Sequence, residues 1–230
     1  MKIALITATE NESLPLCQWL GQVVGEENCA GMHIRIFVHR NIYIYLVRCG
    51  IGEILAASAT QFVIDRYKVD YIINYGFVGS LSHNVKAGDL VLIDKVVHHQ
   101  YDLSKIDNVE PGQYDGRSSV FFELTQSTRD NINHFLTSPL PVVTLASGDM
   151  FITDSKHKEF LSTKYNASVC DMELAGIAIT ALRNSVHVAS IKLVSDGADE
   201  NAPQDYYNYI NRKVSTVEMV LSTIMENIYA

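Results

Sequence analysis

The sequence predicts a single α/β domain in three layers, α/β/α, with helices on both faces of a central mixed sheet that is mostly parallel. Short runs of β-branched and other apolar residues alternate with longer runs in which apolar residues recur at helical spacing. No repeat, low-complexity tract or linker interrupts residues 1–230, and this length is ordinary for one α/β domain. A hydrophobic fraction of 47% is enough for a large core without disulfides.

The first elements are a buried strand at 2–8, where KIALITA is almost wholly apolar, and a helix at 11–24. A hairpin is expected at 32–49, because apolar and polar residues alternate on both sides of a turn at 39–41. After the glycine turn GIG, residues 53–67 have the apolar spacing of a helix.

The middle of the chain continues the alternation. A fully apolar strand is expected at 69–76 and another strand at 88–99, followed by a polar, turn-rich stretch at 101–119. A helix at 122–136 and a strand at 141–147 come next.

The last part predicts a short helix near 155–163, a strand at 167–172, a helix at 173–184, a strand at 186–196 and a final helix near 204–228. Strands separated by helices pair mostly in parallel, and parallel strands place their C-terminal ends at one edge of the sheet. Ligands usually bind at that edge.

Composition narrows the function. The chain has 18 Lys and Arg against 26 Asp and Glu, which disfavours nucleic acid and anionic membranes as partners. Its four cysteines form no CxxC pair and no metal spacing with histidine, and the adjacent His98 and His99 point to opposite faces of a strand. With no signal peptide and no run long enough to cross a bilayer, a cytoplasmic protein without a metal is expected.

Carboxylates gather at the predicted strand ends. TATENE presents Glu12, SGDMF presents Asp149, CDME presents Glu173 and SDGAD presents Asp196. Each has an ordinary structural explanation: Glu12 could complement a helix dipole, Asp149 is expected to cap the next segment, and Asp196 could belong to a turn. Their convergence at one sheet edge is what indicates a site.

The motifs TATENE, CGIG, SGDMFI, DMELAGIA and SDGAD, in this order and spacing, resemble the purine nucleoside phosphorylase superfamily. Within it the sequence is most similar to 5′-methylthioadenosine/S-adenosylhomocysteine nucleosidases, from Met1 to about Ala198. The resemblance implies a three-layer α/β fold, a homodimer or larger assembly, and hydrolysis of a small purine nucleoside without a cofactor. It also implies that the polar stretch 101–119 lies near the subunit contact.

The resemblance assigns roles to individual residues. Glu12 matches the acid that activates the hydrolytic water. Met172 and Glu173 match the pair that holds the ribose. Asp196 matches the general acid that donates a proton toward purine N7, and Ser195 matches the residue that positions it.

Four further residues carry the binding surface that the resemblance implies. Phe151 and Ile152 match residues that sandwich the base and bind its edge through the backbone. Ile51 and Val78 match apolar and backbone contacts around the sugar and base.

The chemistry explains these residue types independently. Breaking an N-glycosidic bond leaves positive charge on the sugar and negative charge on the purine, so an acid near N7 and a carboxylate near the ribose both favour the reaction. Such an acid needs a raised pKa, which burial provides. Glu173 is therefore expected to face the pocket, whereas Asp171 is expected to serve the fold or the helix start.

Two residues depart from the family pattern. The hydrolases usually have a small serine where this chain has Phe77, and often an arginine where Lys192 stands. Lysine supplies the charge but not the bidentate fork of arginine, and phenylalanine removes a hydroxyl and adds bulk. Both positions bear on activity and on the choice of substrate.

Three alternatives to hydrolysis of a 5′-methylthioadenosine-type substrate remain. Phosphorolysis needs a cationic cradle, and it is disfavoured because the early loop TATENES carries two acids and no base. A futalosine-type substrate would require a different 5′ pocket with the same catalysis. A nucleoside-binding or storage protein on the same fold is ranked last, because Glu12, Glu173 and Asp196 are all present.

Overall fold

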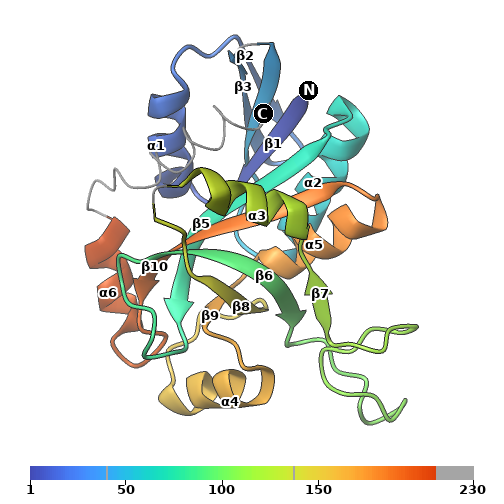
Figure 1. The fold of residues 1–230 in the computed structure, drawn as a ribbon, viewed down its shortest axis with the longest axis vertical. Coiled ribbons are helices and arrows are strands. Elements are labelled where there is room, and N and C mark those ends of the chain that lie inside the picture. The colour runs from blue at the N-terminus through green and yellow to red at the C-terminus, as the bar shows by residue number, and fades with distance from the viewer. Residues whose placement is uncertain (40, 137, 211–230) are drawn as a thin grey trace.

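A ten-stranded mixed sheet forms the centre of the molecule in the computed structural model, which describes residues 1–39, 41–136 and 138–210 (Figure 1). Along the sheet the strands follow the order β10-β6-β8-β9-β5-β1-β4-β3-β2, with β7 paired to β6. The strands are β1 (Lys2–Thr7), β2 (Gly25–Cys29), β3 (Met32–His39), β4 (Ile42–Arg48), β5 (Tyr71–Ser80), β6 (Leu90–His98), β7 (Phe121–Glu123), β8 (Val142–Ser147), β9 (Val169–Asp171) and β10 (His187–Asp196).

Parallel pairing dominates the middle of the sheet. Strands β4, β1, β5 and β10 are parallel neighbours, and β8 is parallel to both β6 and β9. The antiparallel pairs are β2–β3, β3–β4, β6–β7 and the two junctions β6–β10 and β5–β9. Because β5 also pairs with β10, the strands β5, β10, β6, β8 and β9 form a closed ring.

The register brings four strand ends to one place. Gly79 near the end of β5 pairs with both Cys170 of β9 and Asp196 of β10. Ser147, the last residue of β8, pairs with Asp171 at the end of β9. The polar residues that follow these strands are therefore neighbours in space although they lie far apart in the sequence.

Helices cover the sheet on both faces. They are α1 (Glu10–Leu20), α2 (Glu53–Tyr67), α3 (Gln126–Phe135), α4 (Ser155–Tyr165), α5 (Leu174–Arg183) and α6 (Ala202–Ile210). Helices α2 and α5 pack together on one face, and α1 and α3 contribute to a second apolar core on the other. Figure 1 shows α2 and α5 to the right of the sheet, α1 and α6 to the left, and α4 below β8 and β9.

One close contact sets the distance between α2 and α5. A Cβ atom on Gly176 of α5 would lie 2.4 Å from the carbonyl oxygen of Glu53 in α2, which no real Cβ could tolerate. Glycine is therefore required at 176, and it allows the first turn of α2 to approach the start of α5. This approach brings the Glu53 side chain beside the strand ends.

Most predicted elements are present, and the mixed three-layer arrangement is as expected. Two short strands were not predicted: β2, which follows the first helix, and β7, which occupies the expected start of the helix at 122–136. Strand β5 continues to Ser80, beyond the predicted end at residue 76. The final helix begins as predicted, and the part of that prediction beyond residue 210 lies outside the described residues.

The turn-rich stretch 101–119 forms the long connection between β6 and β7, which projects from the body at the lower right of Figure 1. Within the described ranges of the chain, no helix combines the length and the apolar character needed to cross a membrane.

Candidate active site

A cavity of about 370 Å³ lies where the strand ends converge, a size suited to a small organic ligand. All the site residues predicted from the sequence line it. The lining comprises Ala8, Thr9, Glu12, Ile51, Phe77, Val78, Gly79, Met150, Phe151, Ile152, Cys170, Asp171, Met172, Glu173, Ser195, Asp196, Pro203, Tyr206 and Tyr207.

Glu12 lies in the first turn of α1 and is almost fully buried. Its Oε2 accepts hydrogen bonds from the backbone N–H groups of Ala8 (2.8 Å) and Thr9 (2.7 Å), and its Oε1 accepts one from Phe77 (3.0 Å). Glu12 therefore satisfies the helix start, as the simpler interpretation expected, and also lines the cavity. Since a carboxylate can accept about four hydrogen bonds, one remains for a molecule in the cavity.

Glu173 is the residue before α5, and its side chain points back to the start of α2. Its Oε1 accepts a hydrogen bond from the N–H of Gly52 at 3.1 Å, at the partly positive end of that helix. Burial and the neighbouring Asp171 raise the pKa of Glu173, against the opposing effect of the Lys192 ammonium. Glu173 thus lines the cavity with a carboxyl group that holds its proton more tightly than usual.

Asp196 ends β10, at an irregularity in the pairing with β5. Ser195 Oγ donates to its Oδ2 at 2.8 Å, and the N–H of Ala198 donates to its Oδ1 at 2.9 Å. Burial raises the pKa of Asp196 even though both hydrogen bonds lower it. The geometry places Ser195 where it can orient Asp196, and the raised pKa suits a proton donor.

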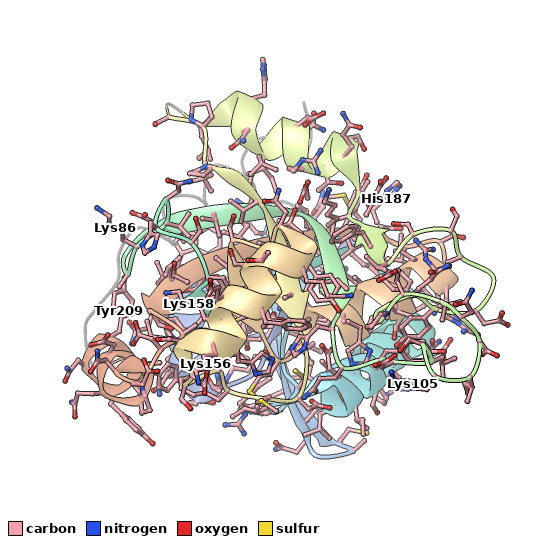
Figure 2. All side chains as sticks on the ribbon, turned by 90° about the horizontal axis from the view of Figure 1, so that it is seen from below. Lys86, Lys105, Lys156, Lys158, His187 and Tyr209 are labelled. Atoms are coloured by element: carbon pink, nitrogen blue, oxygen red, sulfur yellow. The ribbon has the colours of Figure 1, made fainter. Side chains whose placement is uncertain are left out.

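The backbone that follows Asp196 is fixed from α4. Lys158, labelled with Lys156 on this helix in Figure 2, donates from Nζ to the carbonyl oxygen of Gly197 at 2.6 Å. The short segment that carries Asp196 is therefore held both by its own side chain and by a neighbouring helix.

The remaining walls are apolar and aromatic. Val78 and Ile152 are buried, whereas Phe151 and Ile51 are 42% and 56% exposed and lie toward the mouth. Met172 is half-buried beside Glu173. The cavity thus combines carboxyl groups with apolar and aromatic surface, which fits a small ligand that has both polar and apolar parts.

Two tyrosines of α6 also line the cavity, and sequence reasoning missed them. The ring of Tyr206 meets those of Phe151 (5.8 Å between centroids) and Phe77 (6.0 Å) in edge-to-face geometry. Tyr207 lines the cavity as well. The repeated tyrosines of QDYYNYI, shortly after SDGAD, were the available signal, but only the fold shows that they turn toward the site.

Phe77 contributes through its backbone and its ring. The N–H holds Glu12, as described above, while the ring packs edge-to-face against Tyr206 and against Tyr209, at 6.3 Å between centroids. The larger side chain at this position therefore fills the space between Glu12 and α6.

Lys192 lies behind the cavity and is 1% exposed. Its Nζ donates to Asp171 Oδ2 at 2.6 Å, and burial, which lowers the pKa of Lys192, is outweighed by Asp171 and Glu173, which raise it. A Cβ atom on Gly76 would lie 3.0 Å from Glu12 Oε1 and 3.4 Å from Lys192 Nζ, so Glu12 and Lys192 approach each other across this glycine.

Asp171 and Asp149 serve the fold. Asp171 Oδ1 lies 3.4 and 3.3 Å from the N–H groups of Glu173 and Leu174, so it supports the helix start as expected. The prediction that Asp149 caps the next segment was wrong. Its Oδ1 accepts from the N–H of Glu53 at 2.7 Å, so it caps α2, whereas Asp154 caps α4.

Metal ligands are not grouped in the described part of the chain: no three His, Cys, Asp or Glu side chains there could hold an ion together. His98 instead contacts the hydroxyl of Tyr114 through Nδ1, at 2.8 Å.

Comparison with known proteins gives a consistent set of relatives. The family model described as "Phosphorylase superfamily" matches residues 2–226. A 5′-methylthioadenosine/S-adenosylhomocysteine nucleosidase from Bacillus pumilus is 28% identical over 98% of this chain and 99% of its own. An aminodeoxyfutalosine nucleosidase from Helicobacter pylori is 26% identical, with 99% of each chain covered.

Solved structures agree with these matches. A mutant Helicobacter pylori nucleosidase with 5′-methylthioadenosine in its active site has a TM-score of 0.90 to this chain, with 26% identity and 98% of each chain covered. A mutant futalosine hydrolase of the same organism has a TM-score of 0.91, with 25% identity and coverage of 98% of this chain and 99% of its own.

The buried ion pair gives a testable expectation for stability. Lys192→Met leaves the charge of Asp171 buried without its partner, so we expect a loss of about 3–5 kcal/mol in the free energy of unfolding. Lys164→Met is the matched control, because Lys164 forms a more exposed pair with Glu110 (3.1 Å), and exposed pairs contribute about 1 kcal/mol or less. Urea unfolding of both variants measures the difference. Equal losses in the two would contradict the assigned role of Lys192.

Proposed function

The chain belongs to the phosphorylase superfamily, and we propose that it hydrolyses the N-glycosidic bond of a 5′-methylthioadenosine- or S-adenosylhomocysteine-type nucleoside, releasing adenine and a ribose derivative. The observation that carries this proposal is the convergence of Glu12, Glu173 and Asp196 on one cavity from three distant segments. The match over residues 2–226 supports a single functional domain over residues 1–230. With 5′-methylthioadenosine as substrate, the reaction belongs to methionine salvage.

Asp196 is the proton donor to the leaving base. Its raised pKa keeps a proton available closer to neutral pH than an ordinary aspartic acid can, and Ser195 fixes the carboxyl group at 2.8 Å. Protonation at purine N7 neutralises the negative charge that develops on the base as the bond breaks. Phe151 and Ile152 supply the adjacent surface for the base, and Val78 and Ile51 supply contacts around base and sugar.

Glu173 stabilises the sugar. The pKa of Glu173 is raised, chiefly by burial. A cationic sugar at the ribose position reverses this effect, because a nearby positive charge favours the ionised carboxylate. Glu173 therefore interacts more strongly with the transition state than with the neutral substrate, which is the condition for catalysis. Met172 packs beside it against the ribose.

Glu12 takes the proton from the attacking water. Its two oxygens are already oriented by three backbone N–H groups, so little reorganisation is needed when water binds. Three further carboxyl groups, those of Asp171, Glu173 and Asp196, line the same cavity and disfavour an anionic nucleophile, so water is the nucleophile best suited to it.

The positions of the basic residues favour water over phosphate. Arg48 and Arg35 both bind Glu10, through Nη1 at 2.7 Å and Nη2 at 3.2 Å. Lys192 is buried against Asp171. Both arginines are thus already paired with Glu10, and the cavity wall in the described residues contains no lysine or arginine to hold a phosphate.

A futalosine-type substrate is the second candidate, because an aminodeoxyfutalosine nucleosidase matches 99% of the chain. The catalytic acids serve either substrate, and the 5′ group decides between them. A storage protein on the same fold has no need of three buried acids in one cavity, so it ranks last.

We also propose a homodimer. Large apolar side chains are exposed next to cavity-lining residues, at the start of α2 and at Met150, and also in the stretch 101–119, which is unusual for a surface that faces only water. Ile54 and Leu55 at the start of α2 are 77% and 48% exposed, Met150 is 45% exposed, and Ile106 in the stretch 101–119 is 76% exposed. A second copy of the chain over these residues would remove their apolar surface from water.

We place the protein in the cytoplasm. All four cysteines are free thiols, as expected in a reducing compartment.

Asp196→Asn separates catalysis from binding. Asparagine keeps the size of the side chain but delivers no proton, so we expect base release to fall about 10²–10⁴-fold. Affinity for a non-cleavable purine nucleoside analogue, measured by calorimetry, should change much less. Asp102→Asn is the control, because Asp102 does not line the cavity and instead accepts from the N–H of Ser104 at 2.8 Å. Turnover of Asp196→Asn within a few-fold of the parent contradicts the assignment, and binding without turnover in the parent supports storage.

The dimer is tested by light scattering. We expect a species of about twice the 25.7 kDa chain mass at micromolar concentration. Ile54→Asp should shift it toward the monomer, because the substitution buries a charge at the contact. Val24→Asp, at a residue that is 58% exposed beside strand β2, should not. A parent protein that is monomeric under these conditions rules the dimer out.

A further inference from the structure

A second group of polar side chains lies just behind the cavity and crosses the strand ends. It consists of Glu53 of α2, Ser147 of β8, Asp171 of β9 and Lys192 of β10, all between 0% and 8% exposed. None of the proposed catalytic steps uses Glu53 or Ser147. The chemistry of the group therefore needs its own explanation.

The number of hydrogen atoms is the first constraint. Ser147 Oγ lies 2.5 Å from Glu53 Oε1 and 2.5 Å from Asp171 Oδ1, and it accepts from the N–H of Ala175 at 3.2 Å. A serine hydroxyl has one hydrogen and can donate to only one of the two carboxyl groups. The other contact is a hydrogen bond only when that carboxyl group is protonated and donates to Ser147.

The surroundings decide which carboxyl group carries the proton. Asp171 faces the Lys192 ammonium at 2.6 Å and lies close to two backbone N–H groups, an environment that stabilises an anion. Glu53 has the N–H of Gly176 at Oε2. Its charged neighbours are the acids Asp171 and Asp149.

The same environment changes the acidity of Glu53. Burial, and then the neighbouring Asp171, raise the pKa of Glu53 to about 7. The other titratable groups that face it are Asp149, whose Oδ1 binds the Glu53 N–H, and Tyr114 in the connection between β6 and β7.

We propose that Glu53 is held as a neutral carboxylic acid whose proton fixes the Ser147 hydroxyl on Asp171, and that Glu53 is thereby a positioning residue for Glu173. Glu53 donates to Ser147, Ser147 donates to Asp171, and Asp171 binds Lys192. Asp171 in turn supports the N–H groups of Glu173 and Leu174, where the chain presents Glu173 to the cavity. The catalytic consequence rests on the proposed function, whereas the protonation of Glu53 does not.

Loss of the Glu53 proton has two effects. One of the two short contacts of Ser147 loses its hydrogen, and a second anion appears beside Asp171. The added negative charge also disfavours ionisation of Glu173, which the proposed reaction requires. Turnover is therefore expected to fall as the pH rises through about 7.

Two substitutions separate this role from a merely structural one. Glu53→Gln replaces the O–H with an N–H donor to Ser147 and keeps an oxygen for the Gly176 N–H, without a group that titrates. Glu53→Met has similar length but no donor. At pH 6 we expect the turnover of the glutamine variant to stay within a few-fold of that of the parent. Above pH 7 the parent's turnover should decline as Glu53 loses its proton, and the glutamine variant should not show this decline. Turnover of the methionine variant should fall by about 10²-fold both at pH 6 and above pH 7, the loss that a displacement of about 1 Å at a catalytic group can cause.

Protonation is measured without substrate. Carbon-13 NMR of protein labelled at the glutamate carboxyl carbon follows each titration, and the signal absent from Glu53→Gln belongs to Glu53. We expect a midpoint near 7. Glu123→Gln, at an exposed residue of β7, is the control for the effect of a Glu-to-Gln change elsewhere.

Thermal unfolding gives an independent measure. The pKa of Glu53 is about 7 in the folded chain and near its ordinary 4.5 in the unfolded chain, so the folded state binds this proton more tightly. The parent therefore loses stability from this group as the pH rises from about 4.5 to about 7, and Glu53→Gln does not. The difference in Tm, glutamine variant minus parent, should increase from pH 5 to pH 8, while the Glu123→Gln difference should stay constant.

A Glu53 midpoint near 4.5, or a Tm difference that does not change with pH, overturns the protonated state. Equal turnover and equal pH profiles for Glu53→Gln and Glu53→Met overturn the positioning role. If the parent releases no base from any nucleoside, the proposed function fails, but the NMR and Tm results still decide the state of Glu53.

Discussion

The buried ion pair between Lys192 and Asp171 is the interaction on which the site depends. Lys192 is the only lysine or arginine that is buried in the described part of the chain, and it lies among carboxyl groups that include Glu12 and Glu173. Burial of several acids in one place is unfavourable unless a cation or a proton balances them. Lys192 supplies that cation by binding Asp171. Asp171 in turn lies close to the N–H groups at the start of α5, where Glu173 faces the cavity.

Backbone N–H groups complete the arrangement. The two carboxylate oxygens of Glu12 accept hydrogen bonds from three backbone N–H groups. At the N-terminal end of α2, Glu173 accepts from the N–H of Gly52 and Asp149 accepts from the N–H of Glu53. These contacts orient the acids without adding competing charges. Desolvation can then raise the pKa of Asp196 and Glu173, so one cavity contains acids suited to donating a proton and to stabilising a cation.

Sequence patterns predicted the strands and helices whose apolar spacing is long and regular, and the order of motifs at strand ends pointed to the residues that line the cavity. Strands β2 and β7 were missed because they are short and because pairing partners, rather than local spacing, define them. Tyr206 and Glu53 were missed for another reason: their roles depend on how α6 and α2 pack against the strand ends. The prediction for Asp149 was wrong because this residue caps α2, which lies 96 residues earlier in the chain at Glu53. Local sequence rules cannot reveal such a distant partner.

The central claim is that this cavity uses water to break an N-glycosidic bond without a cofactor. Incubation with 5′-methylthioadenosine in ¹⁸O-labelled water, without phosphate and in the presence of a metal chelator, tests it most directly. We expect release of adenine and one ¹⁸O atom in the sugar product, seen by mass spectrometry. Release of base only when phosphate is added, with a phosphorylated and unlabelled sugar, would contradict it.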